Sequence, residues 1–227
     1  MSNAIFITGT DTDVGKTVIT ACITAALIRK GKKVAVYKPI QCGNLLKGKI
    51  KSPDLKFVKD LSDISDDCLF NDYSFKFASS PHLAAELENK KVDISAIKKH
   101  YKEISKKFEY ALIEGAGGLL VPLTRNYTVL DLINELSVPA LVVSRARLGT
   151  INHTSLTINA LKSKNISIIG IIMNCFKGGV IEEDNQKIIN QLNGVPIIGV
   201  VPFSKNLKKL ADNFEKYINI KNFISER

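Results

Sequence analysis

The sequence is short of the residues that build metal centres, disulfides and membrane spans. Its four cysteines stand far apart and form no C-x-x-C pair, so neither a zinc knuckle nor a redox pair is indicated. The three histidines are equally dispersed, which gives no basis for a histidine metal cluster. No apolar run approaches the roughly 18 residues that a membrane-spanning helix needs, and no targeting segment is visible. We therefore expect a cytoplasmic protein with reduced thiols and no membrane contact.

Arginine is also scarce, although the chain is basic. The formal net charge is +10, but only five of the 32 basic residues are arginine. Arginine reads bases and phosphates better than lysine, because its planar guanidinium forms paired hydrogen bonds. The positive charge is therefore interpreted as solvated lysine faces, and no nucleic-acid partner is expected.

What the sequence does contain is enough apolar material for one sizeable core. The 227 residues are 45% hydrophobic, which fits a single domain over residues 1–227. Short β-branched runs alternate with longer amphipathic runs, the pattern of a parallel sheet with crossover helices. Several short runs are apolar almost throughout, as strands covered on both faces are. The predicted fold class is α/β, with a doubly wound and mainly parallel sheet flanked by helices.

The alternation predicts six strands and six helices. The strands are expected over residues 4–8, 33–37, 110–114, 139–144, 167–173 and 196–200. The helices are expected over residues 16–30, 54–61, 94–108, 129–136, 152–163 and 182–192. Residues 44–90 are the least regular and are interpreted as an insertion over the active face. Ligands of an open parallel sheet bind at the carboxyl ends of its strands, so functional residues are sought there.

The segment after the first strand carries the strongest motif. Residues 9–17 read Gly-Thr-Asp-Thr-Asp-Val-Gly-Lys-Thr and precede a predicted helix, whose free N–H groups and positive dipole end would face an anion. Lys16 can reach the outer phosphates of a nucleotide, and the Thr17 hydroxyl can bind Mg²⁺. Five residues separate Gly9 from the Gly-Lys pair, where the standard motif has four. The sequence thus predicts a P-loop NTPase-like site with a variant loop.

Two charged residues follow other predicted strands. Lys38 comes after the second strand, where it can bind a transferring phosphoryl group or an anionic acceptor, or be an ordinary solvated lysine. Glu114 closes the third strand, the place for a carboxylate that holds Mg²⁺ or a water on it. The glycine-rich residues 115–118 would let the backbone approach a ligand closely, although a plain turn is the alternative.

Two further polar residues have both a functional and a structural interpretation. Asp54 heads a predicted helix, where it can cap the amino terminus or supply a second carboxylate to Mg²⁺. Asn174 ends a predicted strand, where it can read a base edge or form a turn. The histidines His82 and His153 are interpreted as structural.

Taken together, these motifs resemble those of dethiobiotin synthetase. The resemblance runs through Gly9 to Thr17, Tyr37-Lys38-Pro39, Ser80-Pro81-His82, Glu114 to Gly118 with Pro122-Leu123, Leu148 to His153, and Asn174. It covers about residues 4–206, and the longer glycine spacing is that family's own form of the loop. Such a series of motifs in order is highly specific.

The resemblance implies an ATP- and Mg²⁺-dependent cyclo-ligase that converts 7,8-diaminononanoate and CO₂ to dethiobiotin, with release of ADP and phosphate. The reaction passes through a carbamate and a carbamic-phosphoric anhydride. The matching positions make Lys38 and Lys16 catalytic and assign the metal to Thr17, Asp54 and Glu114. They assign ATP to Asp13, Val14, Gly15, Lys16, Thr17, Asp54, Glu114, Gly115, Ala116, Gly117, Asn174, Pro202 and Phe203.

The resemblance also implies substrate contacts and an assembly. The substrate residues are Thr12, Lys38, Cys42, Gly149 and Asn152. A homodimer is implied, with the diamine near the interface and residues 149–152 of the partner subunit close to its carboxylate. A helix amino terminus at Asn152 suits that anion. Many family members carry a small hydroxyl residue where this chain has Cys42, a weaker donor.

Two other classes of protein are alternatives to this family. A ParA/MinD-type nucleotide-switch ATPase, which acts in chromosome partitioning or septum placement, carries a second lysine five residues before the invariant lysine. This chain has Asp11 there, a negative charge instead. An amide-forming ligase of the cobyric acid or CTP synthase kind appends a glutamine-hydrolysing domain, for which the chain has no length. The sequence therefore favours the cyclo-ligase.

Overall fold

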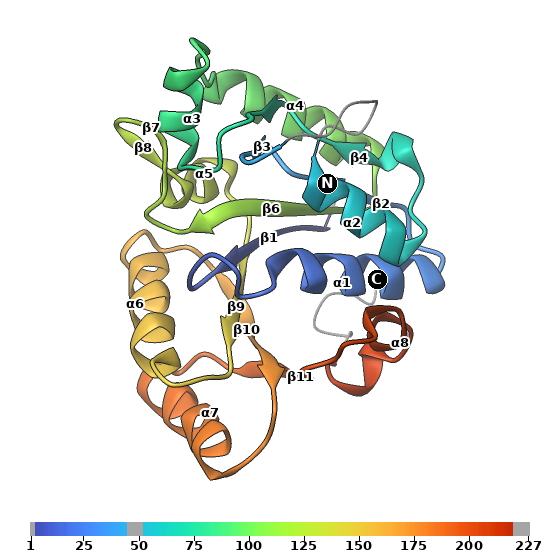
Figure 1. Cartoon of the computed structure of the whole chain (residues 1–227), viewed down its shortest axis with the longest axis vertical. Helices are drawn as coiled ribbons and strands as arrows, with labels where there is room; N and C mark the ends of the chain where they lie inside the picture. The colour runs from blue at the N-terminus through green and yellow to red at the C-terminus, as the bar shows by residue number, and fades with distance from the viewer. Residues whose placement is uncertain (1–2, 45–51, 220–227) are drawn as a thin grey trace.

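The main sheet of the computed structural model has seven strands, and the structure describes residues 3–44 and 52–219. The strand order is β11-β10-β9-β1-β6-β2-β4, and all neighbouring strands are parallel. The sheet twists through the middle of the molecule with helices on either side (Figure 1). This confirms the predicted α/β fold class, with a sheet that is parallel throughout.

The elements alternate along the chain as the sequence predicts. The main-sheet strands are β1 Asn3–Gly9, β2 Val34–Tyr37, β4 Leu69–Phe70, β6 Tyr110–Gly118, β9 Ala140–Arg145, β10 Ile168–Phe176 and β11 Ile197–Pro202. Two small pairs lie outside it: parallel β3 Ile40–Gln41 with β5 Tyr73–Ser74, and antiparallel β7 Pro122–Thr124 with β8 Tyr127–Thr128. The helices are α1 Lys16–Arg29, α2 Pro53–Ser62, α3 Pro81–Leu87, α4 Ile94–Lys107, α5 Val129–Leu136, α6 Thr150–Ser163, α7 Val180–Asn193 and α8 Leu207–Asp212, with 3₁₀ turns at Asp66–Cys68 and Phe214–Lys216.

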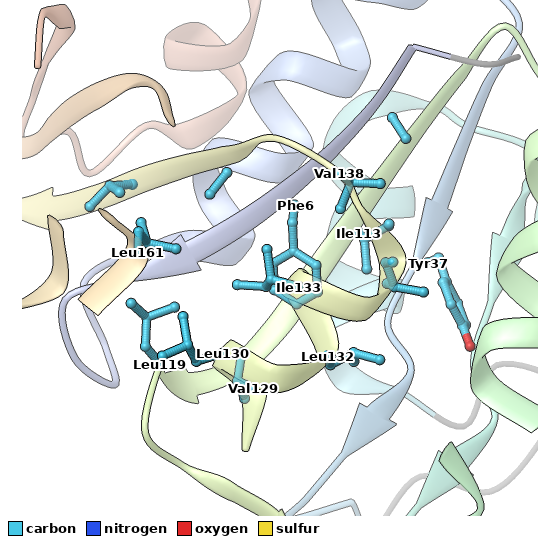
Figure 2. Packing of buried hydrophobic residues seen from close by; sticks show 14 of the residues in the cluster. Phe6, Tyr37, Ile113, Leu119, Val129, Leu130, Leu132, Ile133, Val138 and Leu161 are labelled. Atoms are coloured by element: carbon cyan, nitrogen blue, oxygen red, sulfur yellow. The ribbon is translucent and has the colours of Figure 1, made fainter. Parts of the chain in front are cut away.

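Both faces of the sheet are buried beneath helices. Along β1, Ile5 and Ile7 pack in the cluster that includes α1, α2 and α8, whereas Phe6 packs in the cluster that includes α4, α5, α6 and α7. Figure 2 shows the Phe6 ring directed at Ile133 of α5. An apolar strand without polar alternation is the expected result of such two-sided burial. Among the described residues, no helix is long and apolar enough to cross a bilayer.

The structure corrects several predicted boundaries. Strand β6 does not end at Glu114 but continues to Gly118, which pairs with Gly9 of β1. Strand β10 likewise runs two residues past Asn174, to Phe176. Helix α6 begins at Thr150 rather than at 152, because Gly149 forms its amino-terminal cap with φ 88°. Asn152 therefore lies inside the first turn, and the prediction of a helix amino terminus at that residue is wrong.

The segment predicted to be the least regular contains several helices and strands in its described part. Its residues 45–51 lie outside the described residues, and the remainder contains α2, β4, β5 and α3. Strand β4 adds an edge to the main sheet, where Val36 pairs with Leu69 and Tyr37 with Phe70. A strand of two residues has no readable periodicity, so composition alone could not predict it.

Candidate nucleotide and substrate site

A cavity of about 800 Å³ opens at the carboxyl ends of β1, β2 and β6. Its lining comes from the loop between β1 and α1, the start of α2 and residues 78–81. Two lysines, Lys16 and Lys38, face this space together with the carboxylates of Asp54 and Glu114. The cavity thus lies where an open parallel sheet binds its ligands.

The loop between β1 and α1 depends on two glycines. Gly15 adopts φ +95°, and a Cβ added to it would lie 2.0 Å from Asn174 Nδ2. A Cβ on Gly9 would lie 2.7 Å from Val14 Cγ2. The Asn174 amide closes the loop from β10, two strands away from β1, by donating a 2.9 Å hydrogen bond to the Val14 carbonyl. Neither position can therefore carry a side chain without displacing its neighbours. This is a steric reason for both glycines, in addition to their match to the motif.

Lys16 stands at the start of α1 and is almost completely buried. Its ammonium donates a 2.9 Å hydrogen bond to the Asp11 carbonyl oxygen, which carries no full charge. Burial, and then the positive charge of Lys38, lower the pKa of Lys16 to about 8. The carboxylates of Glu114, Asp54 and Asp11 offset this lowering only in part, and a phosphate group placed in the cavity would add a further negative charge beside the ammonium.

Lys38 leaves the end of β2 and is held between two carboxylates. Its Nζ lies 2.7 Å from Asp54 Oδ2 and 2.9 Å from Glu114 Oε1, and it also donates to the Gly115 carbonyl at 3.0 Å. Burial opposes the ammonium charge, but Glu114 and Asp54 outweigh it and hold the pKa of Lys38 above its ordinary value. Because Lys38 is only 4% exposed, the interpretation as an ordinary solvated lysine is wrong.

Asp54 reaches Lys38 because another residue caps its helix. The Ser52 hydroxyl accepts the Leu55 N–H at 3.2 Å, and Pro53 occupies the first position of α2. The Ser52 hydroxyl also donates to Gln41 Oε1 at 2.7 Å, which ties α2 to β3. The structural interpretation of Asp54 as the cap is therefore wrong, and its carboxylate faces the cavity instead.

Three side chains in the cavity offer oxygen ligands that fit Mg²⁺. The Thr17 hydroxyl donates to Glu114 Oε1 at 2.8 Å. Asp54 and Glu114 are linked by the Lys38 ammonium, which contacts both carboxylates. Within residues 3–44 and 52–219, this cavity included, there is no group of three Asp, Glu, His or Cys side chains that could hold a metal ion without further ligands. Mg²⁺ does not need such a cage, because one or two carboxylates suffice when phosphate oxygens and water complete its shell.

Other predicted site residues line the same cavity. They are Thr12, Asp13, Ala116, Gly117 and Cys42. Burial of the Cys42 thiol raises its pKa to about 11, so the group is a protonated, weak donor at neutral pH. Lining residues that no strand-end argument predicted are Val18, Ile40, Gln41, Ala78, Ser79, Ser80, Pro81 and Val121. Apart from Val18 of α1, they come from β3, the start of α3 and the connections between elements, and only the family resemblance pointed to Ser80 and Pro81.

The remaining predicted residues lie outside this cavity. Gly149 borders a second cavity of about 200 Å³ together with Arg145 and Asp11, while Asn152 is exposed on α6. Phe203 follows β11 and is half exposed, and the Lys177 ammonium lies 5.5 Å from the centre of its ring. The structure therefore brings the loop together with Lys38, Asp54 and Glu114 in the main cavity. Gly149 faces the same loop from the second cavity, whereas Asn152 and Phe203 line neither cavity.

Solved structures share this fold at low sequence identity. The septum site-determining protein MinD from Pyrococcus horikoshii, complexed with Mg-ADP, is 20% identical with a TM-score of 0.61, covering 100% of this chain and 90% of that one. The apo McdA from Cyanthece is 16% identical with a TM-score of 0.63, covering 98% and 96%. Such likeness shows the fold alone. With the glycine loop, Lys16 and Thr17 at the end of β1, it defines the chain as a P-loop nucleotide-binding protein of the α/β class.

Sequence relatives narrow this class to one family. The AAA domain family model AAA_26 matches residues 3–211. The ATP-dependent dethiobiotin synthetase BioD of Halalkalibacterium halodurans is 44% identical, over 92% of this chain and 89% of its own length. That of Thermodesulfovibrio yellowstonii is 39% identical over 92% of each chain. The chain belongs to the ATP-dependent dethiobiotin synthetase family.

Proposed function

We propose that the chain is a single-domain cyclo-ligase that converts 7,8-diaminononanoate, CO₂ and ATP to dethiobiotin, ADP and phosphate. One observation carries the proposal: the Lys38 ammonium is fixed 2.7 Å from Asp54 and 2.9 Å from Glu114, in the cavity that the phosphate-binding loop lines. A positive charge held at that place suits a reaction between two anions. The family of the relatives supports the same activity.

The chemistry proceeds in three steps. One amine of the diamine attacks the carbon of CO₂ and loses a proton, which gives a carbamate. A carbamate oxygen then attacks the γ-phosphorus of ATP and displaces ADP, which forms a carbamic-phosphoric anhydride. Finally the second amine attacks the carbamoyl carbon, loses a proton and expels phosphate with the bridging oxygen, which closes the ureido ring.

The residues of the cavity have separate roles in this proposal. Carbamate and triphosphate repel each other strongly in a partly dry site, so their approach requires fixed positive charge. Lys16 binds the outer phosphates, and Lys38 lies between the γ-phosphate and the carbamate. Thr17, Asp54 and Glu114 would hold Mg²⁺, which when bound neutralises charge on the phosphate oxygens.

The rest of the ligand contacts are proposed on the family resemblance. Asp13, Val14, Gly15 and the backbone from Gly115 to Gly117 surround the phosphates. The amide of Asn174 has an oxygen and a second N–H beyond its bond to Val14, and these suit the adenine edge, with Pro202 and Phe203 beside the base. Thr12 and Cys42 contact the diamine.

The chain's Gly149 and Asn152 lie away from its own main cavity, so we propose that they act in a homodimer. Each subunit then presents residues 149–152 to the diamine carboxylate of its partner. Gly149 leaves the first N–H groups of α6 without a side-chain cap, which suits an anion at that helix end. The ParA/MinD-type alternative shares only the fold with this chain, and its second loop lysine is replaced here by Asp11.

The test is an assay of both products. Purified protein receives the diamine, bicarbonate, Mg²⁺ and ATP, and the release of phosphate and the formation of dethiobiotin are followed together. The proposal predicts equal amounts of the two products and no phosphate release without the diamine. Phosphate release that ignores the diamine, or a complete absence of dethiobiotin, would refute it.

A further inference from the structure

The backbone at Lys38 lies where two sheets meet. Strand β2 pairs with β4 up to Tyr37 and Phe70, and β3 pairs with β5 from Ile40 and Tyr73 onward. Between these two ladders the residues Lys38 and Pro39 pass beside residues 71–72. Pro39 has no N–H to give to a ladder, so regular pairing is interrupted directly after the residue that carries the ammonium group.

The side chain of Asn71 bridges this interruption. Its Nδ2 donates a 2.7 Å hydrogen bond to the Lys38 carbonyl and a 3.1 Å hydrogen bond to the Tyr73 carbonyl. On the other side of the residue, the Lys38 N–H donates to the Phe70 carbonyl at 2.9 Å. Both backbone polar groups of Lys38 are therefore bound by the segment 70–71, and the fixed φ of proline sets the direction of the chain beyond it.

The bridge is itself anchored to the protein. The Tyr73 N–H donates to the Pro39 carbonyl at 3.0 Å, and the Asp72 carboxylate binds both the Tyr37 hydroxyl and His100 Nδ1. His100 lies on α4, so the segment 70–73 is held from β2 and from α4 together. Tyr37 is labelled at the margin of the core cluster in Figure 2.

We propose that Asn71 is a positioning residue for Lys38, acting through the Lys38 carbonyl; the inference rests on the function proposed above. The Lys38 ammonium makes three contacts of 2.7 to 3.0 Å, and these depend on where its backbone lies. Without the amide, the Lys38 carbonyl loses its partner and the backbone shifts to find another. The ammonium then leaves the point where carbamate and γ-phosphate meet.

The first test is a double-mutant cycle on the active enzyme. Asn71→Ala lowers kcat by about 10- to 100-fold, because misplacement of a reacting group by an ångström costs that much. The KM for ATP stays within about twofold, because Lys16 and the loop are untouched. In a Lys38→Ala background, Asn71→Ala has no further effect, since the residue acts through Lys38. Asn71→Asp, of equal size but without donors, gives the same result should the alanine variant fold poorly.

The matched control is Asn193→Ala. The Asn193 amide also makes two hydrogen bonds, 2.8 Å to the Ile189 carbonyl and 3.0 Å to Ser155 Oγ, at the far end of α7. Its loss removes the same number of bonds as the loss of Asn71, away from the cavity. It lowers the melting temperature and leaves kcat unchanged.

A second readout does not require dethiobiotin synthesis. The wild-type protein and the three single variants Asn71→Ala, Asn71→Asp and Asn193→Ala are treated briefly with an amine-acylating reagent, and modification of Lys38 is quantified by peptide mass spectrometry. Lys38 is protected in the wild type and in Asn193→Ala, and is modified several-fold faster in the Asn71 variants. Unchanged Lys38 labelling, or additive losses in the double mutant, would overturn the inference even where the enzyme makes dethiobiotin. Absence of dethiobiotin with faster labelling would instead refute only the proposed function.

Discussion

The two lysines of the cavity differ in how the protein balances their charge. Lys16 donates to a backbone carbonyl, and burial together with the nearby Lys38 lowers its pKa to about 8. Lys38 is more deeply buried, yet two carboxylates keep its pKa above the ordinary value. In the proposed function the loop half of the site takes its main counter-charge from ATP, whereas the Lys38 half has two carboxylates in direct contact. Variants should therefore separate ATP binding from the chemistry of the acceptor.

Removal of Lys38 is expected to have the largest effect, a fall in kcat without a loss of ATP binding. Lys38→Ala lowers kcat by about 10²- to 10³-fold, because the site loses the charge placed for the transition state. ATP affinity, measured by calorimetry, changes little, because the loop is intact. The control is Lys56→Ala, which removes an exposed lysine that pairs with Asp60 at 2.8 Å and leaves kcat unchanged. A parallel loss of ATP binding and kcat in Lys38→Ala would contradict the division between the two lysines.

A smaller effect is expected from neutralising one of the two carboxylates. Glu114→Gln keeps the size of the side chain but weakens any Mg²⁺ site, so the Mg²⁺ concentration for half-maximal activity rises about tenfold. Titration of activity with Mg²⁺ measures the change. Glu135→Gln, which removes an exposed carboxylate paired with Lys98 at 2.6 Å, serves as control. A Glu114→Gln enzyme with the wild-type Mg²⁺ requirement would remove Glu114 from the metal site.

The pH dependence of ATP binding reports the charge of Lys16 separately from that of Lys38. Below about pH 8 the Lys16 ammonium is charged in the free protein, and above it the amine becomes neutral. Bound phosphates favour the charged form, so binding takes up as much as one proton above pH 8 and affinity falls by up to about tenfold per pH unit. Calorimetry in two buffers of different ionisation enthalpy measures this uptake.

The same experiment on Lys38→Ala sharpens the comparison. Because the charge of Lys38 helps to lower the pKa of Lys16, its removal moves the onset of proton uptake to higher pH. Binding without proton uptake at pH 9 in the wild type would show that Lys16 is not the group that responds to the phosphates.

The two halves of the site also differ in how far the sequence predicts them. The loop at residues 9–17 is continuous, so one motif and one predicted helix start define Lys16 and Thr17 together. Lys38 and Glu114 could still be placed on the active face, because the ends of parallel strands meet at one edge. Their direct contact could not be predicted, since it depends on side-chain directions that no pattern records.

Residues that act through other residues were invisible in the sequence. Ser52 caps α2 and thereby frees Asp54, but the sequence equally allowed Asp54 to be the cap. Asn71 lies between strands of two residues each, too short to carry a period. Helix α6 begins directly after Gly149, which caps it with a positive φ. The amino-acid pattern around Asn152 did not reveal this start.

The central claim is that the two halves meet in one step, the transfer of the γ-phosphoryl group to a carbamate oxygen. It is tested most directly with CO₂ labelled with ¹⁸O on both oxygens, supplied with the diamine and unlabelled ATP in a rapidly quenched reaction. The phosphate released is then analysed by mass spectrometry. The account predicts one ¹⁸O atom in each phosphate molecule formed with dethiobiotin. Phosphate that carries an oxygen from water instead would contradict it.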